Sequence, residues 1–106
     1  MNRIIRPAAR DDIMRQFRYY LVDRDLPDVA NRFLEAVETT IGKILSTPNA
    51  GAPRPLSNEA LVSLRSWPVE DFEDIRVYYL AEEHAVRVIR VLHGKRDIER
   101  ILEREQ

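Results

Sequence analysis

The chain has 106 residues and a mass of 12.4 kDa, the size of one domain. Seventeen basic against eighteen acidic side chains give a net charge of -1, which excludes binding of nucleic acid through bulk positive charge. No cysteine is present, which excludes disulfides, thiolate nucleophiles and cysteine-based metal sites. No stretch has the apolar length of a membrane span and residues 1–10 lack a signal-peptide core, so we expect a soluble, cytoplasmic protein without membrane contact.

The N-terminal half predicts a strand and two helices. Residues 2–6 favour a short strand that ends before Pro7, and a helix should begin at this proline. Its apolar stripe consists of Ile13, Phe17, Tyr20 and Leu21, with Asp12, Arg15 and Arg18 on the other side. A second helix begins at residues 26–28, with Asp25 as its cap, and repeats apolar side chains at helical spacing: Ala30, Phe33, Val37, Ile41, Ile44 and Leu45.

The C-terminal half predicts a loop, three strands and a short helix. Residues 48–60 form a proline-rich loop. Strands follow over 61–67, stopped by Pro68, then over 72–80 and 85–93; the last is apolar on both faces, as in a central strand. Asp97 should cap a short helix whose apolar stripe is Ile98, Ile101 and Leu102.

The sum is an α+β fold in the order β-α-α-β-β-β-α. A helical hairpin packs on a small antiparallel sheet, because short turns connect the last three strands. We predict one domain over residues 1–106, made of a strand plus helical hairpin (1–47), the loop (48–60), a β-meander (61–93) and a C-terminal helix with its tail (94–106).

Charge is distributed in blocks along the chain. Residues 1–24 carry a net +3, residues 59–83 a net -5 and residues 87–100 a net +3. Such blocks indicate complementary faces within the fold or toward a partner. Fifteen of the seventeen basic residues are arginine, which either genome base composition or a surface for bidentate contacts would produce.

Few residue patterns point to chemistry. The two histidines, His84 and His93, lack metal-ligand spacing and the glycines are scattered, so no metal and no cofactor is predicted. The segment 93–97 combines a histidine with two cations after the most buried strand; it is either an anion or proton-transfer site or an ordinary strand-to-helix junction. Arg65 and Arg76 either contact phosphates or pair with nearby carboxylates.

The order of these features resembles the ParE branch of the RelE/ParE toxins of type II toxin–antitoxin systems. The resemblance covers nearly the whole chain, and residues 88–97 are its most specific part. The matching segments are residues 7–13, Ala30 with Phe33 and Leu34, the P-x-x-G of Pro48 to Gly51, Leu64-Arg65, residues 75–79 and residues 88–97.

The resemblance implies a toxin neutralised by a cognate antitoxin in a hetero-oligomer. ParE members are implied to inhibit DNA gyrase without being catalysts, whereas RelE members cut messenger RNA on the ribosome with a basic cluster and a C-terminal Tyr or His. This chain departs from the second pattern, because its last tyrosine is Tyr79 and its only lysines are Lys43 and Lys95. Near-neutral charge also makes a poor ribosome-binding surface and argues against strong direct nucleic-acid binding.

Three hypotheses follow. The favoured one is a gyrase-inhibiting toxin; the predicted partner-binding residues are Arg65, Arg76, Arg90, His93, Lys95, Arg96, Ile98, Ile101 and Leu102. The second is a ribosome-dependent endoribonuclease that would use Arg65, Arg76 and His93. The third is a non-toxic family member that only binds antitoxin.

Overall fold

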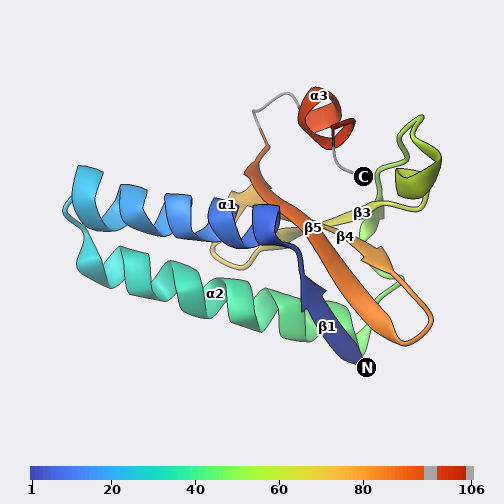
Figure 1. Cartoon of the computed structure of the whole chain (residues 1–106). Helices are drawn as coiled ribbons and strands as arrows, with labels where there is room; N and C mark the ends of the chain where they lie inside the picture. Colours follow the sequence, from blue (N-terminus) through green and yellow to red (C-terminus); the bar gives the residue numbers. More distant parts are fainter. Residues whose placement is uncertain (95–97, 105–106) are drawn as a thin grey trace.

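The computed structural model describes residues 1–94 and 98–104 as an α+β fold with one five-stranded sheet (Figure 1). Its elements are, in order, β1 (Asn2–Ile5), α1 (Pro7–Arg18), a π-helical turn (Tyr19–Asp23), α2 (Pro27–Ser46), β2 (Ala52–Pro53), a 3-10 helix (Glu59–Leu61), β3 (Arg65–Val69), β4 (Phe72–Ala81), β5 (Ala85–His93) and α3 (Ile98–Leu102). The strand order is β1-β5-β4-β3-β2. The predicted fold class is confirmed.

The sheet is mixed and not purely antiparallel, which corrects one part of the prediction. The turns between β3, β4 and β5 impose antiparallel pairing, as expected. β1, however, runs parallel to β5, with Ile5 opposite Val88. No hairpin joins these two strands, because α1, α2 and strands β2 to β4 lie between them in the sequence, so nothing forces them to be antiparallel.

The helical hairpin covers one face of the sheet, which we call the inner face (Figure 1). The core of this layer includes Phe33, Val37, Ile41 and Ile44 of α2, all buried as their helical spacing predicts. Tyr20 closes the far end of the core, since its ring lies 5.7 Å from Phe33 and 5.7 Å from Phe72, measured between centroids.

The π-helical turn changes which side chains of the first helix are buried. It adds a residue per turn, so the 3.6-residue spacing no longer holds beyond Arg18. Tyr20 stays in the core, but Leu21 is exposed, which corrects its predicted place in the apolar stripe. Asp25 does not cap α2 either; it has a φ of 52° and forms the turn, and Leu26 occupies the cap position.

β3 begins later than predicted. Asn58 accepts a hydrogen bond from the Ala60 N–H at 2.9 Å and caps a 3-10 helix, so Leu61 lies in that helix and not in a strand. Pro68 does not stop the strand but lies inside β3. It is tolerated there because β2 pairs only with Arg65 and Ser66, which leaves one side of β3 without a neighbour at residue 68.

β5 is an interior strand, paired with β1 on one side and β4 on the other, as its two apolar faces predict, and it has the predicted bounds. Its register shifts between Tyr78 and Tyr79 of β4, so Ile89 is an extra residue that bulges out of the ladder. Val86, Val88 and Val91 pack on the inner face with the hairpin, whereas Ile89 and Leu92 pack on the opposite, outer face.

A second apolar cluster lies on the outer face, where α3 and the 3-10 helix cover part of the sheet (Figure 1). Ile98 and Leu102 of α3 are buried in it and Ile101 is partly buried. The predicted stripe of α3 therefore packs against the sheet. The predicted cap, Asp97, lies outside the described residues. Among the described residues, no helix has the length and hydropathy needed to cross a membrane.

Candidate functional site

The P-x-x-G segment after α2 is held by a tyrosine and an arginine of the sheet. The Tyr79 hydroxyl donates to the Pro48 carbonyl at 2.8 Å and accepts from the Gly51 N–H at 3.1 Å. Arg65 Nη1 donates to the Gly51 carbonyl at 2.8 Å. A Cβ at position 51 would overlap the Tyr79 hydroxyl, so only glycine fits. We call Pro48, Gly51, Arg65 and Tyr79 the loop clamp.

In the loop clamp, Arg65 has a structural role. From the sequence we predicted that it contacts phosphates or pairs with nearby carboxylates. The side chain is half-buried and directed to a backbone carbonyl, not to an acid. The clamp also explains why the motif residues Pro48, Gly51 and Tyr79 occur together. All three belong to the sequence motifs, but no local pattern connects them, because 28 residues separate Gly51 from Tyr79.

The loop clamp predicts a loss of stability at alkaline pH. Burial raises the pKa of Tyr79, opposed by the hydrogen bond from Gly51 and the charge of Arg65. The folded protein therefore holds this proton more tightly than the unfolded chain, whose tyrosine pKa is about 10. The stabilisation is complete below that pH and is lost as pH rises through the folded-state pKa.

We expect the free energy of unfolding, measured by urea titration, to fall as the pH rises above about 10. Tyr79→Phe should show a shallower fall than the parent chain because one titrating group is removed. Equal slopes in the two proteins would contradict this assignment. Tyr78 adds to the effect, since burial also raises its pKa, with Arg54 and Arg76 opposing the shift.

Arg76 lies on the outer face of the sheet. Its Nε donates to the Ser66 hydroxyl at 3.1 Å, and Ser66 is directly opposite Tyr78, a member of the outer cluster. The charges of Arg54 and Arg76 both act on the Tyr78 phenol, so these three side chains share one region. Sequence reasoning did not single out Arg54 or Tyr78.

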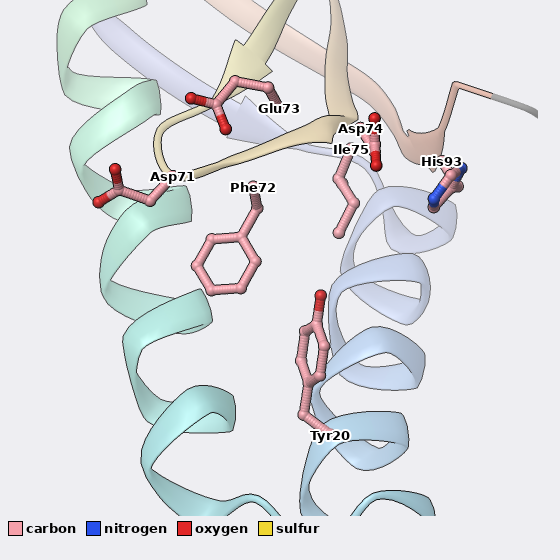
Figure 2. Close-up of a pocket in the computed structure, with 7 residues that line it drawn as sticks. All are labelled: Tyr20, Asp71, Phe72, Glu73, Asp74, Ile75 and His93. Carbon is pink, nitrogen blue, oxygen red and sulfur yellow. The ribbon is translucent and has the colours of Figure 1, made fainter.

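His93 lies at the end of β5, opposite Ile75 of the inner cluster. It lines a cavity of about 330 Å³ that opens between α1, α2 and the β3–β4 turn (Figure 2). The Tyr20 hydroxyl points into this space, next to Phe72 and Ile75, while the acidic side chains around it are spread along the rim and do not converge (Figure 2). The remaining lining residues are Asp71, Glu73 and Asp74.

The three residues predicted for ribonuclease chemistry are not brought together. Arg65 is opposite Tyr79, whose side chain packs on the inner face, whereas Arg76 lies with Ser66 on the outer face. His93 also lies on the inner face, but it is opposite Ile75 in the first half of β4, whereas Arg65 is opposite Tyr79 near the end of that strand. Cleavage of RNA requires proton transfer and charge stabilisation at one phosphate, and this arrangement does not supply both.

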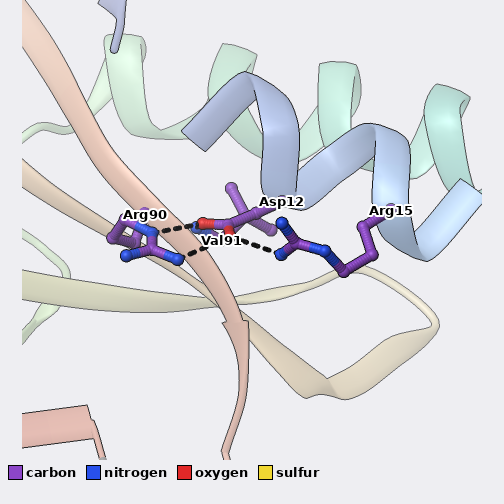
Figure 3. A network of polar contacts seen from close by, with 4 residues as sticks. All are labelled: Asp12, Arg15, Arg90 and Val91. Carbon is purple, nitrogen blue, oxygen red and sulfur yellow. Dashed lines mark hydrogen bonds and ion pairs between the residues drawn. The ribbon is translucent and has the colours of Figure 1, made fainter. Parts of the chain in front are cut away.

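Arg90 joins β5 to α1 in a buried ion pair (Figure 3). Its Nε and Nη2 donate to the two carboxylate oxygens of Asp12 at 2.6 Å and 2.8 Å, and the Val91 N–H donates to the same carboxylate at 3.0 Å. Arg15 adds a longer contact of 3.4 Å. Asp12 is therefore buried, which corrects its predicted place on the outward side of α1.

The remaining predicted partner-binding residues lie at the C-terminal end. Ile98, Ile101 and Leu102 belong to the outer cluster, and Lys95 and Arg96 lie outside the described residues. Beside this cluster a groove of about 540 Å³ runs between β1, β5 and the 3-10 helix. Its apolar wall includes Ile4, Leu61, Leu80 and Ile89. Among the described residues, no three His, Asp or Glu side chains are placed to hold a metal ion.

Comparison with models of known protein families shows which family this chain belongs to. Residues 3–98 match the model of the family described as the ParE toxin of the type II toxin-antitoxin system, parDE. The chain belongs to the ParE toxin family. This confirms the resemblance found in the sequence, and the matched range runs from the second residue of β1 to the first residue of α3.

A solved structure shows the same fold. A chain described as the chromosomal ParDE TA system from P. aeruginosa superposes with a TM-score of 0.69. The alignment covers 88% of this ParE-family chain and 95% of that one, at 16% sequence identity. No curated protein sequence matches. The fold is therefore conserved between two chains that share few residues, and the loop clamp and the Asp12–Arg90 pair show which contacts hold it here.

Proposed function

We propose that this ParE-family protein is a cytoplasmic toxin that inhibits DNA gyrase by binding to it and that a cognate antitoxin neutralises it in a hetero-oligomer. Membership of the ParE family over residues 3–98 carries the proposal. The placement of Arg65, Arg76 and His93 supports inhibition by binding over catalysis, since these side chains lie on two faces of the sheet and Arg65 is engaged in the loop clamp.

The antitoxin is proposed to cover the outer face of the sheet. The groove between β1, β5 and the 3-10 helix offers an apolar wall, and exposed apolar grooves are typical of protein-binding surfaces. Ile101, partly buried on α3, and Arg76 near Tyr78 are predicted partner-binding residues that lie on the outer face of the sheet. Lys95 and Arg96 remain predicted contacts by sequence alone. Arg90 is assigned to the fold, because Asp12 occupies its guanidinium.

The decisive experiment compares two targets. We expect the purified protein to block supercoiling by DNA gyrase and to accumulate cleaved DNA, and to leave messenger RNA intact in a translating extract. Addition of the antitoxin, encoded by a small neighbouring reading frame, should restore supercoiling. Codon-periodic cuts in messenger RNA together with unchanged supercoiling would contradict the proposal and support the ribonuclease hypothesis. A chain that binds antitoxin but affects neither assay would be a non-toxic family member.

A further inference from the structure

The exposed apolar side chains of this protein are concentrated at one place, the end of the helical hairpin far from the sheet (Figure 1). Eight large apolar side chains are exposed among the described residues, and five of them lie in this short part of the chain. They are Met14, Tyr19, Leu21, Val22 and Leu26, and we call them the hairpin tip. Val22 is 68% exposed, the largest fraction in the set.

The π-helical turn carries three of the five side chains of the hairpin tip. Tyr19, Leu21 and Val22 all lie in this turn. Had the α-helix continued, Leu21 would share the buried stripe of Ile13 and Tyr20, as its spacing predicts. Single π turns inside helices are uncommon and occur frequently at functional sites. The turn thus leaves Leu21 exposed to solvent, whereas the spacing of an ordinary helix would place it in the apolar stripe.

Charged side chains flank the hairpin tip with opposite signs. Arg15 and Arg18 occupy the last turn of α1, on one side. The connection and the first turn of α2 carry three exposed carboxylates, at Asp23, Asp25 and Asp28, and one exposed cation, Arg24, whose Nη1 donates to the Tyr19 hydroxyl at 3.3 Å, so this side is net negative. A complementary partner would place carboxylates over α1 and cations over the connection. This pattern fixes an orientation for whatever covers the apolar centre.

The hairpin tip is separate from the outer-face groove. The groove is lined by residues of β1, β4, β5 and the 3-10 helix and shares no side chain with the tip. A toxin that is both neutralised and active requires two protein partners, and this molecule has two distinct apolar surfaces. Of these, the tip belongs to the hairpin end that projects beyond the sheet (Figure 1). A projecting end can enter a recess of a much larger protein.

We infer that the hairpin tip is the surface that docks on the target enzyme, in an apolar recess bordered by carboxylates toward α1 and by cations toward the connection. This inference rests on the proposed function. It assigns the outer face to the antitoxin and the tip to the target.

The test uses the paired variant Leu21→Asp/Val22→Asp, which places charge on the tip without touching the buried core. We expect its half-inhibitory concentration for gyrase supercoiling to rise at least about tenfold, because a central apolar contact is lost. Antitoxin affinity, measured by calorimetry, should stay within about twofold of the parent value. A twofold change corresponds to a difference in binding free energy of less than about 0.5 kcal/mol. Thermal unfolding verifies that the variant folds.

Two further variants sharpen the result. Val62→Asp is the matched control, because Val62 is 56% exposed but lies outside the tip, and it should inhibit gyrase like the parent chain. Arg18→Glu should slow association with gyrase and reduce its dependence on salt. A folded tip variant that inhibits gyrase normally, or one that loses antitoxin binding instead, would overturn the inference alone. A parent chain that leaves gyrase untouched would overturn the proposed function and this inference together.

Discussion

Replacing Asp12 by alanine should lower the free energy of unfolding by about 3 kcal/mol, the largest effect expected from an ion pair in this protein. The side chain of Asp12 is 2% exposed and that of Arg90 is 15% exposed. Without the carboxylate, the Arg90 guanidinium is left in a largely buried place without its bidentate partner. The Val91 N–H loses its acceptor as well, which adds the cost of an unsatisfied buried donor.

Equilibrium unfolding in urea measures this effect. Asp11→Ala is the matched control, since Asp11 is the adjacent aspartate on the same helix but is exposed, and it should change stability by less than about 0.5 kcal/mol. The free energy of unfolding of Asp12→Asn should lie between those of the two alanine variants. The amide oxygen still accepts the hydrogen bond from the Val91 N–H but carries no charge. Equal stability of the Asp12→Ala and Asp11→Ala variants would show that the pair does not hold α1 to β5.

Substitution of Gly51 by alanine should destabilise the protein by about 2–4 kcal/mol, with a physical cause different from that of Asp12. The new methyl group would overlap the Tyr79 hydroxyl and lie 2.9 Å from two carbons of its ring, so the clamp has to open. Tyr79→Phe should cost about 1–2 kcal/mol, since it removes the hydroxyl that bridges Gly51 and Pro48.

A double-mutant cycle separates the clash from the lost hydrogen bonds. Gly51→Ala combined with Tyr79→Phe should be more stable than the sum of the single effects implies, because the hydroxyl that meets the methyl group is absent. Gly42→Ala is the matched control: nothing lies within 4 Å of a Cβ there, so alanine should stabilise α2 by up to about 1 kcal/mol. Additive effects in the cycle would contradict the close approach of Gly51 to Tyr79.

The elements that the sequence predicted well are those in which local pattern and burial agree. The apolar spacing of α2 and the two-sided apolar pattern of β5 both describe how these segments pack. The errors arose where another interaction overrides the pattern. Leu61 follows Asn58, whose side chain caps a helical turn, and Leu21 lies after a π turn that no apolar spacing indicates.

The candidate site was harder to predict than the fold, because the roles of its residues depend on contacts between distant segments. Arg65, Arg76 and Arg90 look alike in sequence as lone cations in strands. In the structure they bond to a loop carbonyl, a neighbouring hydroxyl and a helix carboxylate. No local signal distinguishes these partners. Asp12 was misplaced for the same reason, since helical spacing alone puts it on the polar side.

The pairing of β1 with β5 constrains how the protein is made. Asp12 and Arg90 are 78 residues apart, and Ile5 meets Val88 in the ladder, so the first strand and first helix obtain their fixed places only after the last strand leaves the ribosome. A nascent chain that ends before Ala85 lacks β5, the strand with which both β1 and β4 pair, so β1 and α1 are fixed in place only late in synthesis.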